Sequence, residues 1–304
     1  MRPRTDRQRT FRLRDLPLWL AIAIAWLLVR LPLPLLLRIG IGIGWLGDRA
    51  ARSRAHIADV NLALCFPELD VRARRALRRR TFRAYGIAFV ETAIAWLRPV
   101  TALTRRTQID GLEHVRAAQA RGHGVLLLGA HFSTLDLAGA LLATALRLDI
   151  TYRRNRNPAI EWLMHQGRAR CYDRVHERDD VRAAIRSLRE GRVLWYAADQ
   201  DYGRRHSVFA PFFGVPAATI TAATRIAAAG GAEVLFFSHF RTESPWAWQL
   251  SIQPLPAGYP SGEAVQDATL LNAHIEAQVR RDPAQYLWLH RRFKTRPAGE
   301  ARPY

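Results

Sequence analysis

The sequence has little cysteine, a single lysine and no nucleotide-binding loop. Only Cys65 and Cys171 occur in 304 residues, which excludes a disulfide framework and a cysteine-rich zinc site. So few cysteines are typical of a protein in a reducing compartment. We find neither a P-loop nor a dinucleotide fingerprint, because Gly230-Gly231 stands where a predicted helix ends and reads as a cap. The sequence therefore predicts no cofactor and no metal.

Acidic residues are also few relative to basic ones. The net charge is +20 and the pI is about 11.4, and arginine carries nearly all the positive charge, since Lys294 is the only lysine. Such an excess predicts an anionic partner, which could be nucleic acid, an anionic membrane surface or an anionic substrate. We find no recognisable nucleic-acid-binding motif. Hydrophobic residues make up 49% of the chain, enough for a sizeable core.

No uninterrupted apolar run is long enough to cross a bilayer. Six arginines in residues 1–14 precede the apolar run 16–29, and Arg30 and Arg38 interrupt the apolar residues that continue to position 47. A span needs roughly 20 apolar residues, and the prolines also disfavour a straight helix. We therefore expect residues 1–47 to be a basic flank followed by a membrane-embedded or interfacial helical anchor, with the main domain over 48–304. The alternative is a pair of buried core helices.

The rest of the chain predicts an α/β fold. Residues 48–100 have helical spacing, with Asp70 suited to cap the helix over 70–97. Beyond residue 105, short apolar runs alternate with helical segments, which predicts a mixed, mostly parallel sheet covered by helices. The expected strands are 124–130, 149–153, 192–199, 232–240 and 247–254, the last two antiparallel. The expected helices are 134–146, from 158, 181–189, 216–229 and 264–281.

Three polar clusters come directly after predicted strands. They are "HFSTLD" at 131–136, "RRNRNP" at 153–158 and "DQDYGRRHS" at 199–207. Because ligands of such sheets gather at the carboxyl ends of strands, we expect the clusters to converge at one edge.

The first cluster pairs a histidine with an acid. Of the ten histidines, only His131 has an acidic residue at i+5, namely Asp136. The two side chains could meet if His131 lies in the turn before a helix and Asp136 in its first turn. A carboxylate on one imidazole nitrogen would leave the other free as a general base for a hydroxyl nucleophile. The alternative is a core histidine beside an acid that complements the helix dipole.

Four further stretches carry a family resemblance. The chain resembles the late acyltransferases of lipid A biosynthesis, of the Kdo-dependent lauroyl type, within the glycerolipid and lysophospholipid acyltransferase superfamily. The resemblance extends over roughly residues 16–297 and rests on the His131–Asp136 spacing and on "NLALCFPEL" (61–69), "GIAFVETAIAW" (86–96), "VLWYAADQDYGRRHSVFAPFFGVPAAT" (193–219) and "QYLWLHRRFKTRP" (285–297).

This resemblance implies an activity. It implies transfer of a fatty acyl chain from acyl carrier protein to a hydroxyl of a 3-hydroxyacyl chain on a Kdo-bearing lipid A precursor, Kdo-lipid IVA, at the cytoplasmic face of the inner membrane. His131 would be the base and Asp136 its orienting partner, where many members have glutamate. Two alternatives remain: acylation of another glycolipid or lysophospholipid, and a basic nucleic-acid-binding protein at a membrane.

The resemblance also implies roles for other residues. Arg168, in a Gly-Arg step, would stabilise negative charge on the thioester or a phosphate. We expect Asp199 to position Arg168 or the loop of His131, whereas Asp201 fits a turn with Gly203 as well as it fits a functional role. The remaining predicted substrate-binding residues are Arg153, Asn155, Asn157, Gln200 and Tyr202. Arg154, Arg156 and Arg170 fit a solvated helix face equally well, and His206 is expected to be structural.

Overall fold

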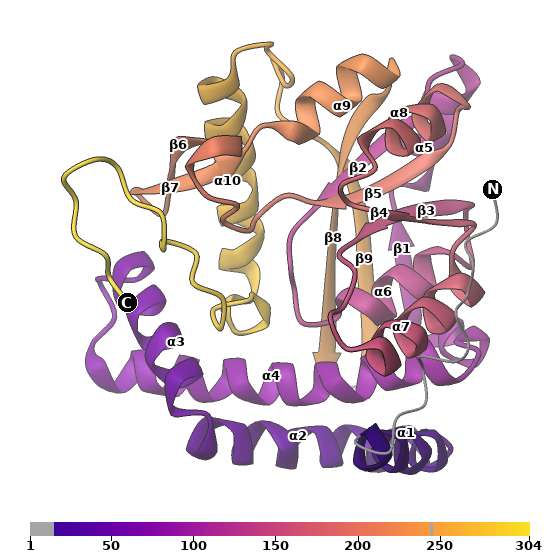
Figure 1. The fold of residues 1–304 in the computed structure, drawn as a ribbon, viewed down its shortest axis with the longest axis vertical. Coiled ribbons are helices and arrows are strands. Elements are labelled where there is room, and N and C mark those ends of the chain that lie inside the picture. The colour runs from indigo at the N-terminus through magenta and orange to yellow at the C-terminus, as the bar shows by residue number, and fades with distance from the viewer. Residues whose placement is uncertain (1–14, 244–245) are drawn as a thin grey trace.

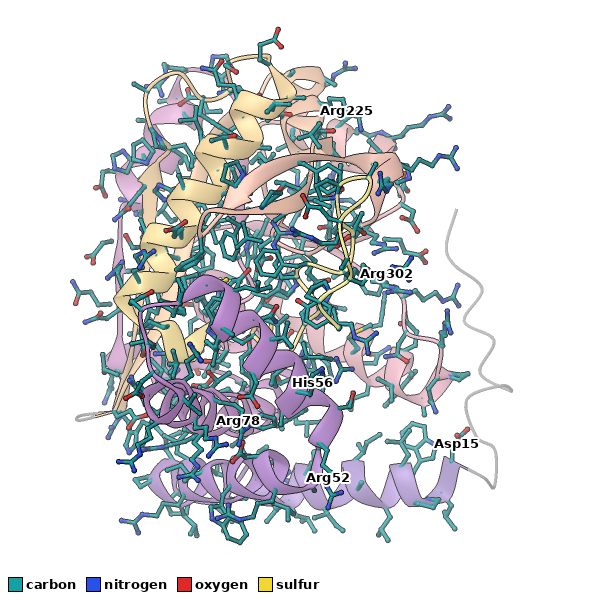
Figure 2. The ribbon with its side chains drawn as sticks, turned by 90° about the vertical axis from the view of Figure 1, so that its left-hand side faces the viewer. Asp15, Arg52, His56, Arg78, Arg225 and Arg302 are labelled. Atoms are coloured by element: carbon teal, nitrogen blue, oxygen red, sulfur yellow. The ribbon has the colours of Figure 1, made fainter. Side chains whose placement is uncertain are left out.

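The computed structural model describes residues 15–243 and 246–304. The predicted basic flank before residue 15 lies outside them. Helices α1 (Leu16–Leu28) and α2 (Leu33–Ala50) form an outer layer at one end of the molecule, next to α4 (Val71–Leu97) (Figure 1). In Figure 2 the exposed Arg225, from the helix after the two-stranded sheet, lies at the opposite end from this layer.

Close backbone contact joins α2 to α4. A Cβ atom built on Gly86 would lie 2.2 Å from the carbonyl oxygen of Gly40 and 2.6 Å from the Cα of Gly44. Only glycines tolerate that approach. The α4 helix begins at the predicted cap, since the Asp70 carboxylate accepts a hydrogen bond of 2.7 Å from the amide of Ala73. α3 (Arg52–Cys65) connects α2 to α4.

Within the described residues, no helix is both long and apolar enough to cross a membrane. The predicted boundary after residue 47 falls inside α2, so no element ends there. α1 contributes no buried residue to the fold.

In the part of the chain that the structure describes, the main sheet has seven strands in the order β1-β9-β8-β2-β5-β3-β4, and within this sheet only β8 and β9 pair antiparallel. This confirms the expected mixed, mostly parallel sheet. The strands are β1 (Thr107–Asp110), β2 (Val125–Gly129), β3 (Leu148–Tyr152), β4 (Arg174–Glu177), β5 (Val193–Ala197), β8 (Glu233–Glu243) and β9 (Trp246–Pro254). β1 and β4 were not predicted, because each strand has only four residues and neither contains an apolar run.

Helices cover both faces of the sheet (Figure 1). Besides α4, they are α5 (Leu112–Ala120), α6 (Leu135–Leu142), α7 (Pro158–Cys171), α8 (Val181–Arg189), α9 (Ala222–Gly230) and α10 (Ala264–Arg281). The 3-10 turns are η3 (Thr101–Arg106), η4 (Arg204–His206) and η5 (Pro283–Gln285). Along β2, Leu126 and Leu128 belong to the core with α8, α9 and α10. Val125 and Leu127 belong to the core with α4, α5 and α6. Central strands buried on both faces explain the continuous apolar run.

The predicted helix over 216–229 is wrong in its first part. Residues Val215–Ile220 form β7, which pairs antiparallel with β6 (Ser207–Phe212) in a separate two-stranded sheet. β-branched Val215, Thr219 and Ile220 favour a strand, and the helix begins only after Thr221. The small apolar residues of 216–229 have helical spacing, so the sequence did not indicate the change from strand to helix at Thr221.

Candidate active site

His131 lies just beyond the carboxyl end of β2, and Asp199 just beyond that of β5. The two strands are parallel neighbours, with Gly129 of β2 beside Ala197 of β5. His131 and Asp199 each come two residues after this pair, so the register places them together. The imidazole Nδ1 lies 2.5 Å from one carboxylate oxygen of Asp199, and the His131 amide donates to the other at 2.9 Å.

This contact defines the state of the imidazole. A carboxylate only accepts, so Nδ1 carries the proton of the bond and Nε2 keeps a lone pair in the neutral ring. The Tyr85 hydroxyl donates to the His131 carbonyl oxygen at 2.9 Å, which ties the loop to α4. The His131 side chain is 25% exposed and that of Asp199 only 2%, so the acid is buried and the base is accessible.

Burial and charge act oppositely on this pair. Burial would lower the pKa of His131, but the charge and hydrogen bond of Asp199, together with the charge of Asp136, raise that pKa above its usual 6.5. Burial likewise opposes ionisation of Asp199, but the His131 charge and hydrogen bonds, with Arg292, lower the pKa of its carboxyl to about 2. The structure therefore holds Asp199 as an anion that favours the imidazolium.

Asp136 does not occupy the expected place. We predicted that it would bind the His131 ring, and the structure corrects that contact. Asp136 accepts hydrogen bonds from Arg168 Nη2 at 3.1 Å, Trp96 Nε1 at 3.2 Å and Thr92 Oγ1 at 3.3 Å. In the first turn of α6 it faces α4 and α7, whereas the end of β5 already supplies an acid to His131. Asp136 still lies close enough for its charge to act on that ring.

Arg168 reaches the site because Gly167 precedes it. A Cβ on Gly167 would lie 2.5 Å from the Cβ of Trp96, so only glycine lets α7 pack this closely on α4. The Arg168 guanidinium also lies 5.6 Å from the centre of the Trp96 ring. A cation is thereby held beside Asp136, near His131.

The three polar clusters converge as predicted. A pocket of about 270 Å³, called here the histidine pocket, is lined by His131 and Asp136 from the first cluster, Arg153 from the second, and Gln200 and Tyr202 from the third. Arg168 also lines it, as do aromatic side chains of β3 and β5. The carboxyl edge of the sheet therefore offers a base, a cation and partly apolar walls in one space.

Asn155 and Asn157 use their side-chain oxygens locally. The Asn157 oxygen caps α7 by accepting from the amides of Ala159 at 2.9 Å and Ile160 at 3.2 Å. The Asn155 oxygen accepts from the amide of Asn157 at 2.9 Å. Their binding to substrate stays a prediction.

Asp201 forms a turn with Gly203, which was one of its two expected roles. Its carboxylate accepts from the Gly203 amide at 2.8 Å, and Gly203 has φ +85°. It also accepts from the amide and hydroxyl of Thr295 at 2.8 and 2.9 Å, which ties the "DQDYG" stretch to the C-terminal motif. Asn61 joins the same region, since its amide donates to the carbonyl oxygens of Trp288 and His290.

Sequence reasoning missed Arg178. It lines the histidine pocket, and its guanidinium lies 5.3 Å from the centre of the Tyr202 ring. Arg178 comes directly after β4, so the rule that ligand-binding residues lie beyond strand ends would have found it had that short strand been recognised.

Comparison with known proteins identifies the family of the chain. Residues 5–295 match the family model described as "Bacterial lipid A biosynthesis acyltransferase". The chain belongs to this family. It is 40% identical over 282 residues to the lipid A biosynthesis lauroyltransferase of Escherichia coli K12, covering 92% of each chain. It is 37% identical to the palmitoleoyltransferase of that organism over 94% of each chain, and 30% identical to its myristoyltransferase over 86% of this chain and 81% of the relative. The protein is therefore an acyltransferase.

Proposed function

We propose that this acyltransferase transfers a lauroyl chain from acyl carrier protein to the hydroxyl of a 3-hydroxyacyl chain on Kdo-lipid IVA. The reaction takes place at the cytoplasmic face of the inner membrane. The observation that carries the proposal is His131, held by the buried Asp199 at the wall of a pocket that also contains Arg168. The relative that acts as a lauroyltransferase supports the choice of chain.

The proposed mechanism needs one base. Nε2 of His131 takes the proton of the lipid hydroxyl while the oxygen attacks the thioester carbonyl carbon. The new ester C–O bond forms, the C–S bond breaks, and the imidazolium returns the proton to the departing thiolate. Asp199 orients the ring and stabilises the imidazolium between these steps. Transfer is direct in this proposal, because Ser133 and Thr134 are buried and neither residue lines the histidine pocket.

Arginines supply the positive charge. Arg168, positioned by Asp136, stabilises the negative charge that develops on the thioester oxygen. Arg153 binds a phosphate of the acceptor, with the amide NH₂ groups of Asn155 and Asn157 as further donors. Gln200 and Tyr202, which also line the histidine pocket, contact the substrate.

The layer of α1 and α2 lies in the membrane interface in this proposal. Its large exposed apolar side chains are Leu16, Leu20, Ile24, Trp26, Leu27, Leu28, Leu35, Ile43, Trp45 and Leu46. The Arg30 guanidinium stacks 3.3 Å from the Trp26 ring centre, and Arg49 stacks 3.8 Å from that of Trp45. Tryptophan with a neighbouring arginine suits the headgroup region, where each arginine near anionic lipid contributes about 1 kcal/mol.

The test is acyl transfer by the purified full chain with lauroyl-acyl carrier protein and Kdo-lipid IVA in detergent micelles. We expect mass spectrometry to show one added lauroyl group with the wild type and none with His131→Ala, while both proteins bind anionic vesicles equally. Product with a lysophospholipid but not with Kdo-lipid IVA would overturn the proposed identity of the acceptor. Full activity of His131→Ala would overturn the mechanism.

A further inference from the structure

A second, apolar depression lies between α2, α4 and the segment 287–290. This apolar groove has a volume of about 410 Å³. Its walls include Ile43 and Gly47 of α2, Phe82, Tyr85 and Phe89 of α4, and Leu287. Phe89 is 69% exposed and Ile43 is 42% exposed, so large apolar side chains border it on the surface.

The apolar groove connects with the catalytic histidine. A smaller pocket of about 190 Å³ shares Tyr85, Phe89 and Leu287 with the groove and is also lined by His131 and Asp136. The histidine pocket borders His131 on its other side. The imidazole therefore stands between a pocket with arginines and an apolar path that begins at α2.

Helix packing creates this path. Gly40, Gly44 and Gly86 bring the backbones of α2 and α4 into contact. At Gly47, less than one turn after Gly44, that contact has ended. A Cβ there would meet only the Phe82 ring, at 3.3 Å. The helices separate where the groove is found, and the absence of a side chain at Gly47 leaves it open.

The polar groups in the groove are neutral or engaged. Burial lowers the pKa of His290 to about 4, so its ring is uncharged at neutral pH. Tyr85 donates to the His131 carbonyl oxygen, and Arg54 donates to the Leu289 carbonyl oxygen at 3.1 Å. Arg54 is the arginine among the residues that line the groove, and the other lining side chains are apolar or neutral, which favours a hydrocarbon over most of the groove.

We propose that the apolar groove holds the hydrocarbon chain of the acceptor lipid. This inference rests on the proposed function and names the part of the substrate that the groove takes. The hydroxyl of a 3-hydroxyacyl chain lies close to the headgroup, so with that hydroxyl at His131 the headgroup faces the arginines of the histidine pocket. The rest of the chain then extends past Leu287 toward α2. The groove starts from the helix layer whose exposed apolar side chains include Trp45 and Leu46, which is where a chain would arrive from a membrane.

The test uses two glycines of one helix. Gly47→Leu fills the groove, whereas Gly42→Leu is the matched control, because a Cβ at Gly42 has nothing within 4 Å and Gly42 does not line the groove. In micelles, we expect Gly47→Leu to raise KM for the acceptor at least about tenfold, as expected when two buried methylene groups are lost. KM for the acyl donor should stay within about twofold, and Gly42→Leu should match the wild type.

A second variant keeps the proposal testable if Gly47→Leu misfolds. Phe89→Glu changes an exposed side chain and places a carboxylate in the groove, so it should also raise KM for the acceptor while retaining the melting temperature. If Gly47→Leu does not fold, this variant decides. If the wild type is active and both folded variants keep the wild-type KM for the acceptor, the proposed role of the groove is overturned but the proposed function is not. An inactive wild type would overturn the proposed function itself.

Discussion

Asp199→Asn tests which acid serves His131. The substitution keeps the shape but removes a charge that lies 2.5 Å from Nδ1. At an effective dielectric constant of about 20, unit charges about 4 Å apart interact by about 4 kcal/mol, or roughly three pKa units. Burial already acts to lower the pKa of His131, so without Asp199 that pKa should fall by at least about one unit. Loss of ring orientation should lower kcat by about 10³–10⁴.

The assay is the pH dependence of kcat/KM for acyl transfer. His131 acts as a base only when neutral, so a raised pKa places the acidic limb of the wild-type profile above pH 6.5. Activity is lost as the pH falls through that pKa. Asp199→Asn should move the limb to lower pH with a much smaller plateau, whereas Asp136→Asn should move it less, because the Asp136 charge is the weakest contribution. An unchanged limb and near-normal kcat in Asp199→Asn, with a large shift in Asp136→Asn, would refute this assignment.

Three further substitutions probe the site and the fold. Arg168→Gln should lower kcat/KM by about 10²–10³ with the acidic limb retained, measured in the same assay; equal activity would exclude a role in charge stabilisation. Glu91→Ala leaves the buried Arg241 without its 2.8 Å ion pair, and should cost about 3–5 kcal/mol in urea unfolding. Asp201→Ala should cost about 1–3 kcal/mol and speed proteolysis of the C-terminal segment; wild-type resistance would contradict the role of Asp201 in holding that segment.

Local pattern was enough to locate the longer strands and most helices, and to select His131 as the candidate base. The apolar run before His131 predicted β2, and α8 and α10 occupy the predicted residues 181–189 and 264–281, because burial repeats with the period of each element. The rule that ligands gather at strand ends correctly predicted that three distant polar clusters meet at one edge. In residues 216–220, helical spacing and β-branched residues favour different elements, and the sequence pattern predicted a helix where the structure has β7.

The sequence by itself determined the family and the α/β class, and it singled out His131 as the candidate base, since these depend on residue identity and short-range spacing. Only the tertiary structure decided that Asp199 rather than Asp136 holds the imidazole, because the register of β2 against β5 sets that contact across 68 residues. It also decided that the apolar groove leads to His131 through the smaller pocket, because the walls come from α2, α4 and residues near 287, which adjoin only after folding.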